Sequence, residues 1–181
     1  MTLAHAPTMQ PTALLALDFT THVVETFSHD PGVAQRAAQV LRLARAASVP
    51  VFHIVPKQRR AEIHPLLAPT ADEHVLAKTT IGAFATTPLH DLLRDAGIGQ
   101  IIVAGIATSG TVLSTARWAF DVGYHVIVCA DACADPDPEA HAALIDRKIF
   151  ASSWLGLWRI ANVLSTADIP LFTPPGPGQQ G

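Results

Sequence analysis

The stretch IIVAGIATSGTVLSTAR, residues 101–117, decides the fold that this sequence predicts. Its first four residues form an unbroken apolar run, which is typical of a strand covered on both faces. Small residues follow at 105–110, and apolar residues at helical spacing then continue toward a stop at Gly123. A strand that turns directly into a helix leaves backbone N–H groups free at the helix start. Proteins of the α/β class bind anions and place nucleophiles there.

Strands and helices alternate on both sides of this stretch. Apolar runs predict further strands at 12–19, 49–55 and 124–129, and a short last strand at 162–164. Helices are predicted at 30–48, 87–97 and from 137 to about 150, each opened by a capping residue or an early proline.

This alternation predicts a single α/β domain with three layers, α/β/α, around a mostly parallel sheet of five or six strands. We place the domain at residues 12–172 and expect flexible termini at 1–11 and 173–181.

Composition limits the class of protein. The chain has 181 residues, 49% hydrophobic and 15% charged, which is typical of one globular domain with a large interior or an oligomeric surface. A net charge of −3 without a basic run argues against nucleic-acid binding. No apolar run approaches the roughly 20 residues that span a bilayer, and no signal peptide is visible. With only two cysteines, we expect a cytoplasmic protein without disulfides.

Candidate functional residues gather where predicted strands end. Asp18 closes the first strand, and a carboxylate there serves chemistry, caps a helix or is a buried structural group; position alone leaves these open. Lys78 precedes a small-residue turn and would place an ammonium beside Asp18, the alternative being an ordinary surface lysine. The irregular stretch 56–77 is either a lid or assembly contact, or a solvated loop. His53, inside a strand, is interpreted as a satisfied interior group.

Together these motifs resemble the isochorismatase-like hydrolases, a family that includes isochorismatases, nicotinamidases and N-carbamoylsarcosine amidase. The resemblance covers most of the chain, from about Thr12 to Leu164. Four motifs carry it, in this order: Asp18; Lys78 ahead of Gly82-Ala83-Phe84 and Thr87 to Leu89; Gly105-Ile106-Ala107-Thr108 with Val112 and Thr115-Ala116; and Gly123-Tyr124 leading to Asp131-Ala132-Cys133-Ala134.

In the amidase members of this family, an aspartate, a lysine and a cysteine form the site. The cysteine attacks a carbonyl carbon, the aspartate accepts its proton, and backbone N–H groups of a turn hold the oxyanion. The resemblance places the aspartate on Asp18, the lysine on Lys78 and the cysteine on Thr111, where this sequence departs from the pattern. It also implies a cis peptide between Ile106 and Ala107, and an oxyanion site built from the backbone of Ile106, Ala107, Gly110 and Thr111.

Threonine in place of cysteine changes the chemistry. A thiol has a pKa of about 8.5, whereas a hydroxyl is far less acidic and threonine is also β-branched, so Thr111 as nucleophile is one hypothesis only. Cys129 and Cys133 are interpreted as structural. True isochorismatases also lack the nucleophile. Their aspartate protonates the enol carbon of a vinyl ether, and water adds to the resulting oxocarbenium ion.

The resemblance also bears on ligands. Some nicotinamidases bind a metal through an Asp-x-His pair after the second strand; residues 55–58 here read VPKQ, so we expect neither metal nor cofactor. A cluster of arginines for a dicarboxylate is not visible; the nearest candidates are Arg59, Arg60 and Arg117. Three aromatic residues are predicted to line the mouth of the site: Phe19, Phe84 and Trp118.

The sequence therefore predicts an isochorismatase-like hydrolase of a small polar molecule, with Asp18 as general acid or base and Lys78 as its charged partner, without a cysteine nucleophile. The alternative is a catalytically silent relative that serves as a binding or assembly subunit. A dinucleotide-binding oxidoreductase is disfavoured, because residues 17–20 read LDFT rather than a glycine-rich turn. We expect a homo-oligomer, a dimer or larger, without a nucleic-acid or membrane partner.

Overall fold

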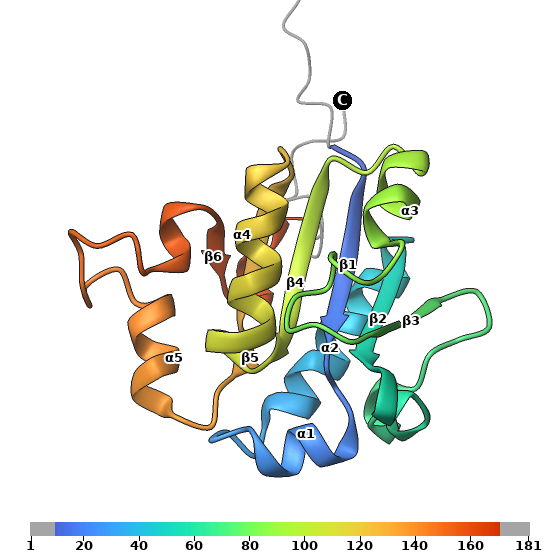
Figure 1. Cartoon of the computed structure of the whole chain (residues 1–181), viewed down its shortest axis with the longest axis horizontal. Helices are drawn as coiled ribbons and strands as arrows, with labels where there is room; N and C mark the ends of the chain where they lie inside the picture. Colours follow the sequence, from blue (N-terminus) through green and yellow to red (C-terminus); the bar gives the residue numbers. More distant parts are fainter. Residues whose placement is uncertain (1–9, 171–181) are drawn as a thin grey trace, which may run out of the picture.

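The structure is a computed structural model, and it describes residues 10–170, without the side chain of residue 61. Flexible ends are expected at 1–11 and 173–181; residues 1–9 and 173–181 lie outside the described residues, and the Pro11 carbonyl accepts from the Gly99 and Gln100 amides. A six-stranded sheet forms the centre of the domain, and every neighbouring pair of strands is parallel (Figure 1). The order is β3-β2-β1-β4-β5-β6, with bounds β1 Thr12–Leu17, β2 Val51–Pro56, β3 His74–Lys78, β4 Gln100–Ile106, β5 His125–Ala134 and β6 Asn162–Leu164. The predicted α/β class and parallel sheet are confirmed.

Helices cover both faces of the sheet. They are α1 Thr21–Thr26, α2 Val33–Ala46, α3 Leu89–Asp95, α4 Leu113–Asp121 and α5 Pro138–Ile145. Shorter turns are η1 Lys57–Glu62, η2 Pro65–Leu67, the π-helical turn η3 Thr108–Val112, η4 Leu157–Arg159 and η5 Thr166–Asp168. Among residues 10–170, no helix is long and apolar enough to cross a membrane.

Two separate cores form because successive strand residues point to opposite faces. Leu15 and Leu17 of β1 pack into the core that includes residues of α3 and α4, and Leu14 and Ala16 pack into the core that includes α2. Figure 1 shows α3 and α4 in front of the sheet and α2 behind it. Because both faces are covered, β1 is buried along its whole length, which explains its continuous apolar sequence.

Two strand predictions are corrected. The stretch 56–77 is not wholly irregular, because it contains η1, η2 and most of the edge strand β3. All but the last residue of β3 keep some exposure, so its sequence shows no apolar run. Strand β5 continues through Ala134, whereas a loop was predicted from 131 to 135. A register shift between Val103 and Gly105 of β4 accompanies this continuation.

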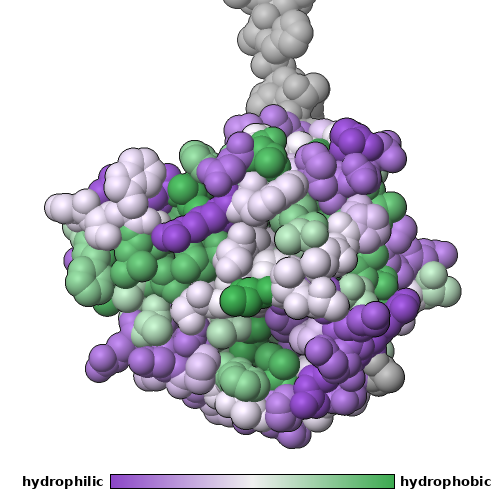
Figure 2. Space-filling model, viewed as in Figure 1, coloured by the Kyte–Doolittle hydropathy of each residue, from purple (hydrophilic) through white to green (hydrophobic). Residues whose placement is uncertain are grey.

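The helix predictions differ at their ends. Helix α2 begins at Val33 with Gly32 as N-cap, because the Asp30 carboxylate instead accepts a hydrogen bond from the Gly32 amide at 2.8 Å. Helix α1 was not predicted. Asp137 caps α5 as predicted, but that helix ends at Ile145, well before 150. The segment after α5 exposes large side chains: Phe150 at 61%, Trp154 at 71% and Leu155 at 37%. Figure 2 shows a hydrophobic patch, in green, on the left of the molecule, where Figure 1 draws this segment.

The course of the chain determines where a site forms. From the central strand β1, the chain adds β2 and then β3 toward one edge of the sheet. It then returns to the other side of β1 and adds β4, β5 and β6 toward the opposite edge, so the order of the strands reverses between β1 and β4. Parallel α/β sheets bind ligands beyond the strand carboxyl ends at such a reversal. Leu17 pairs with Gly105, which puts Asp18 opposite the turn after β4. A Cβ on Gly105 would lie 2.6 Å from the Leu17 Cβ, so this close approach requires glycine.

Candidate active site

Asp18 is the first residue after β1, and its backbone is held in an unusual conformation. Its φ is 59°, in the left-handed region that aspartate tolerates better than most residues. The Asp18 amide donates to the Ile54 carbonyl at 2.8 Å, and the Asp18 carbonyl accepts from the Thr20 amide at 2.7 Å. These two bonds fix the direction of the carboxylate, whose side chain is 11% exposed.

Lys78 is the last residue of β3, and its ammonium contacts the other two predicted catalytic residues, Asp18 and Thr111. The Nζ atom lies 2.8 Å from Asp18 Oδ2 and donates to Thr111 Oγ1 at 3.0 Å. It also donates to the carbonyl of Ile81. An ammonium carries three protons, so these three acceptors use them all. Lys78 is therefore committed to holding Asp18 and Thr111 together.

The chain that follows Lys78 crosses the end of the sheet toward α4 (Figure 1). It is anchored there by the Ala83 amide, which donates to Thr115 Oγ1 at 3.1 Å. A Cβ on Gly82 would come within 3.3 Å of the Ser114 Cβ, so the segment lies directly against the helix. This anchoring keeps the Ile81 carbonyl within reach of Lys78.

Thr111 lies in η3 and is 3% exposed. Because Lys78 donates to the hydroxyl oxygen, the hydroxyl proton of Thr111 is free to point elsewhere. The second carboxylate oxygen, Asp18 Oδ1, is buried and has no hydrogen-bond partner among the described residues. The site thus holds one engaged carboxylate oxygen and one that is available for a proton.

Burial raises the pKa of Asp18 above its ordinary value of 3.8. The charge of Lys78 and the contacts with Lys78 and Thr111 oppose that rise without cancelling it. A carboxyl group with a raised pKa keeps its proton to higher pH, and it can therefore give a proton as well as accept one.

The turn after β4 supplies the backbone groups predicted to hold an oxyanion. The peptide bond between Ile106 and Ala107 is cis. The amides of Gly110 and Val112 both donate to the Ala107 carbonyl at 3.2 Å, so the predicted Gly110 donor is already engaged. The Ala107 amide donates to no backbone or side-chain acceptor within residues 10–170. Ala107 is therefore the better placed of these two donors.

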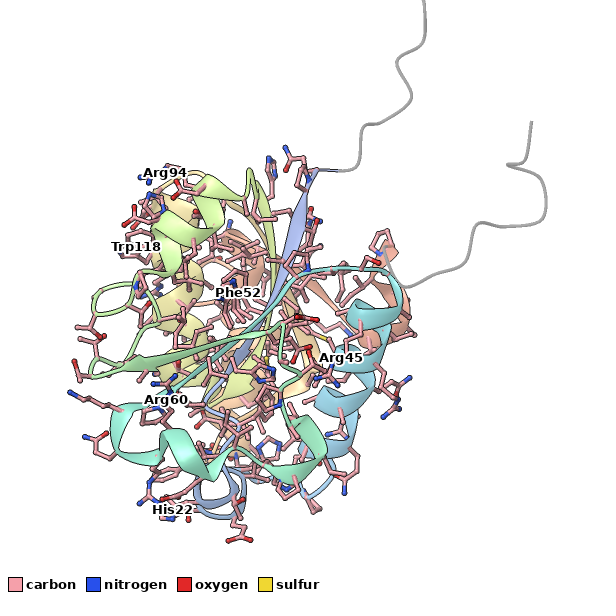
Figure 3. The ribbon with its side chains drawn as sticks, turned by 90° about the vertical axis from the view of Figure 1, so that its right-hand side faces the viewer. His22, Arg45, Phe52, Arg60, Arg94 and Trp118 are labelled. Atoms are coloured by element: carbon pink, nitrogen blue, oxygen red, sulfur yellow. The ribbon has the colours of Figure 1, made fainter. Side chains whose placement is uncertain are left out.

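The three aromatic residues predicted at the mouth pack elsewhere. Phe19 is 1% exposed and belongs to the core beneath α2. Phe84 stacks on Trp118 with ring centroids 4.2 Å apart. Figure 3 shows Trp118 near Arg94, toward the opposite end of the molecule from His22 on α1. We therefore leave these three residues out of the proposed site.

The other candidates also have structural partners. Arg59 pairs with Glu62 at 2.8 Å, and Arg117 donates to the Trp154 carbonyl at 3.4 Å. Cys129 and Cys133 are buried, and burial raises the pKa of both thiols, that of Cys133 to about 12. Across the described part of the chain, no group of three or more His, Cys, Asp or Glu residues is arranged to hold a metal.

Three residues at the turn received no role of their own from the sequence. Thr108, Asp135 and His141 contact one another or the turn residue Ser109. Asp135 belongs to the strand-end stretch 130–135, where function was expected to gather, but its contact with the Ser109 amide could not be read from the sequence. The Ile81 carbonyl gave no signal, because a backbone acceptor has no distinguishing residue type.

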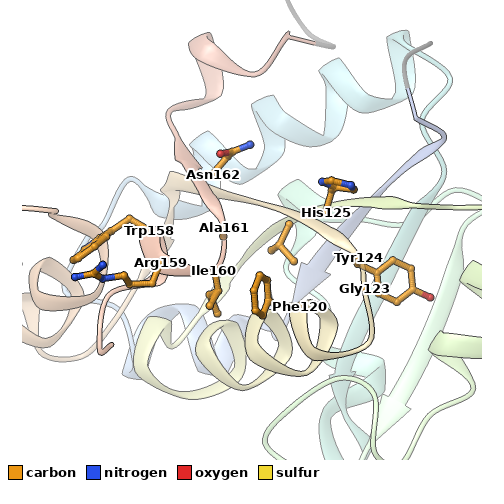
Figure 4. Close-up of a pocket in the computed structure, with 10 residues that line it drawn as sticks. Phe120, Gly123, Tyr124, His125, Trp158, Arg159, Ile160, Ala161 and Asn162 are labelled. Atoms are coloured by element: carbon orange, nitrogen blue, oxygen red, sulfur yellow. The ribbon is translucent and has the colours of Figure 1, made fainter. Parts of the chain in front are cut away.

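One cavity of about 400 Å³ lies at the other end of the sheet, near the start of β5 and β6. Figure 4 shows Trp158 and Arg159 side by side at its edge, where the guanidinium lies 4.5 Å from the centroid of the indole ring. The residues that line this cavity do not include Asp18, Lys78 or Thr111. It is therefore separate from the candidate active site.

Comparison with known proteins gives consistent matches. The isochorismatase domain model matches residues 12–168. Streptothricin hydrolase from Streptomyces noursei is 31% identical over 98% of this chain and 78% of that protein. Nicotinamidase 3 from Arabidopsis thaliana is 25% identical over 82% of this chain and 86% of that protein. The structure of an isochorismatase family protein from Burkholderia thailandensis superposes with a TM-score of 0.75 at 27% identity, covering 90% of this chain and 96% of the other.

Proposed function

Because this chain belongs to the isochorismatase family of hydrolases, we propose that it hydrolyses a small polar molecule with Asp18 as general acid and base. Lys78 is its charged partner, and the chain uses no cysteine nucleophile. The observation that carries the proposal is the position of one ammonium, 2.8 Å from the Asp18 carboxylate and 3.0 Å from the Thr111 hydroxyl.

The role of Asp18 follows from its two oxygens. Oδ2 is held by Lys78, so the carboxyl group cannot rotate freely, and the unpartnered Oδ1 is the oxygen that exchanges a proton with substrate. Because burial raises the pKa of Asp18, this carboxyl group keeps its proton to a higher pH than an ordinary aspartate does. Lys78 stabilises the carboxylate after the proton has left.

The non-covalent route is the one we favour. Protonated Asp18 donates its Oδ1 proton to the enol carbon of a vinyl ether, which leaves an oxocarbenium ion. Water adds to that ion and returns one proton to the Asp18 carboxylate. The hemiketal then collapses to an alcohol and a carbonyl compound. This route needs an acid and a neighbouring ammonium, both of which are proposed here, and no nucleophilic side chain.

The covalent route is the competitor. The Thr111 oxygen attacks an amide carbonyl and its proton passes to Asp18 Oδ1; the tetrahedral oxyanion faces the Ala107 amide. Collapse releases the amine with the proton from Asp18, and water then hydrolyses the acyl-threonine. Lys78, donating to Thr111 Oγ1, favours the developing alkoxide. A hydroxyl is nevertheless a far weaker nucleophile than a thiolate, and this one is 3% exposed.

The test begins with a panel of small amides and vinyl ethers, including nicotinamide, streptothricin and isochorismate, which the names of the relatives and the family suggest. With any compound that is turned over, Asp18→Asn should lose activity by about 10²–10⁴-fold, the usual contribution of general acid–base catalysis. Thr111→Val should keep most of the activity on the non-covalent route and lose it on the covalent route. Full activity in Asp18→Asn would remove both routes. Arg94→Met, which breaks an exposed ion pair with Asp91, is the control.

A catalytically silent relative is the second candidate, and the low exposure of Thr111 together with the missing thiol favours it. The discriminating variant is Thr111→Cys. If wild type hydrolyses nothing in the panel while Thr111→Cys hydrolyses an amide, the framework is intact and the natural chain has lost the activity. Turnover by wild type removes this candidate.

We also propose that the chain forms a homo-oligomer. The support is the exposed apolar surface on the segment after α5, where Trp154 is 71% and Phe150 61% exposed. Light scattering after size exclusion measures the mass directly. Trp154→Glu should shift a dimer or larger assembly toward the monomer, and a monomeric wild type would contradict the proposal.

A further inference from the structure

A second set of contacts holds the turn from the side of β5. Asp135 follows β5 and is 2% exposed. Its carboxylate accepts the Ser109 amide at 2.7 Å and the Asp137 amide at 3.3 Å. Among the described residues, no cation forms an ion pair with Asp135. A buried carboxylate without a counter-ion is costly unless backbone amides satisfy it, so the Ser109 contact is a strong constraint on the turn.

His141 of α5 holds the neighbouring residue. The Thr108 hydroxyl lies 2.8 Å from His141 Nδ1 and 3.1 Å from the Ala134 carbonyl. A hydroxyl has one proton, so both contacts are satisfied when Thr108 donates to Ala134 and the Nδ1–H of His141 donates to Thr108. Thr108 is 0% exposed, so water cannot substitute for either partner without opening the turn.

His29 braces the same corner from the segment between α1 and α2. Its amide and its Nδ1 atom both contact the Asp135 carbonyl, at 2.8 and 2.7 Å. The His29 and His141 rings lie 5.4 Å apart between centroids. Three segments therefore meet at residues 108 and 109: the end of β5 with Asp135, the segment before α2 with His29, and helix α5 with His141.

We propose that Asp135 and His141 are positioning residues of the active site, acting through Ser109 and Thr108 to hold Thr111 against Lys78. The inference rests on the function proposed above for Asp18, Lys78 and Thr111. Ser109 and Thr108 precede Thr111 by two and three residues in the same short turn, so their side-chain and amide contacts set where its hydroxyl lies. Displacements of about 1 Å at a reacting group can cost about 10²-fold in rate.

The consequence can be measured without a known substrate. The variant Thr111→Cys places a thiol beside Lys78, and the pH dependence of its alkylation by iodoacetamide gives the pKa of that thiol. Cys129 and Cys133 do not interfere, because both are buried with raised thiol pKa values. A thiol held next to an ammonium has a lowered pKa, and a displaced thiol returns toward about 8.5.

In the Thr111→Cys background, Asp135→Ala should raise the pKa of the introduced thiol by at least about half a pH unit. This is a small part of the difference between a free thiol and a thiol whose pKa a neighbouring cation lowers. Loss of the carboxylate charge alone would lower that pKa, so the sign separates positioning from simple electrostatics. Asp91→Ala is the control: it removes a carboxylate from an exposed ion pair with Arg94 on α3 and should leave the pKa of the introduced thiol unchanged. A fall, or no change, in folded Asp135→Ala overturns the proposal.

Two substitutions of His141 test the proposal even if Asp135→Ala does not fold. His141→Asn places a side-chain N–H near the position of Nδ1 and should preserve the thiol pKa, whereas His141→Leu should raise it. Equal values in these two variants would contradict the role of His141. Circular dichroism and thermal unfolding check that each variant is folded. Failure of the underlying function looks different: there, Asp18→Asn would leave the thiol pKa unchanged, whatever Asp135 and His141 do.

Discussion

The ion pair between Lys78 and Asp18 offers a sharp prediction about stability. Their side chains are 4% and 11% exposed, so the pair lies almost entirely in the interior. Lys78→Met keeps the apolar stem of the side chain and removes only the ammonium. It leaves Asp18 as a buried carboxylate without a cation, and it takes away the donor to Thr111 and to the Ile81 carbonyl.

Breaking a buried pair by removing one partner costs about 3–5 kcal/mol. For a chain of this size, each kcal/mol lowers the midpoint of thermal unfolding by about 2–4 °C, so we expect a fall of about 6–20 °C. Arg94→Met is the matched control, because Arg94 and Asp91 pair at 2.9 Å with side chains 60% and 64% exposed. That variant should unfold like wild type.

The loss should grow with pH. Lys78 opposes the rise in the pKa of Asp18, so removing Lys78 raises that pKa further in the folded state. A carboxyl group whose folded pKa is raised contributes stability that is complete below its unfolded pKa and is lost as pH rises through the folded value. The penalty of Lys78→Met therefore increases as pH rises from the folded-state pKa of Asp18 in wild type, which lies above 3.8, toward the higher folded-state pKa in the variant.

Urea unfolding of wild type, Lys78→Met and Lys78→Met/Asp18→Asn, each at pH 5 and pH 8, measures these free energies. The double variant should recover part of the loss at pH 8, since it replaces the uncompensated carboxylate with a neutral amide. The reasoning is refuted if Lys78→Met costs less than about 1 kcal/mol at both pH values, the range of exposed pairs.

Three further changes have definite expected outcomes. Burial raises the pKa of Glu73, but hydrogen bonds from Arg45, His53 and the Thr70 amide outweigh burial and lower the pKa to about 2. Glu73→Gln should therefore lower the free energy of unfolding by about 1–3 kcal/mol at pH 7. In urea titrations this difference from wild type should disappear as pH falls from 4.5 toward 2. Gly105→Ala should cost at least about 1–3 kcal/mol by thermal unfolding, because the new Cβ meets Leu17 at 2.6 Å, while Gly99→Ala, with its nearest contact at 3.5 Å, should be neutral. Asp137→Ala removes an N-cap that accepts from the Glu139 and Ala140 amides, and it should cost about 1 kcal/mol in thermal unfolding.

The parallel sheet was predictable because its central strands are buried on both faces. A strand that is buried on both faces needs nearly continuous apolar residues, as at 12–17 and 101–106, whereas a strand with an exposed face alternates apolar and polar residues. Strand β3 could not be found in the same way, since it is an edge strand with a mixed pattern of exposure. The aromatic predictions failed to locate a binding wall because Phe84 and Trp118 pack on each other, and residue type alone does not separate packing from recognition.

The site was predictable only in part, for a related reason. Asp18 and Lys78 belong to motifs that the family resemblance places in order, so their roles could be carried over residue by residue. The Ile81 carbonyl and the contact between Asp135 and the Ser109 amide depend on backbone positions that only the folded chain defines. The extra length of β5 brings Asp135 to the turn, but the stretch ADACAD at 130–135, with its two aspartates, favoured a loop over that continuation.

The central claim is that Asp18 is a proton-carrying carboxyl group held by an ammonium in one closed site. A ¹³C NMR titration of the side-chain carboxyl carbon of Asp18, assigned by comparison with Asp18→Asn, tests it most directly. The account predicts a pKa above the ordinary 3.8 in wild type and a higher one in Lys78→Met. A carboxyl group that titrates at or below 3.8, and that does not respond to removal of the ammonium, would contradict it.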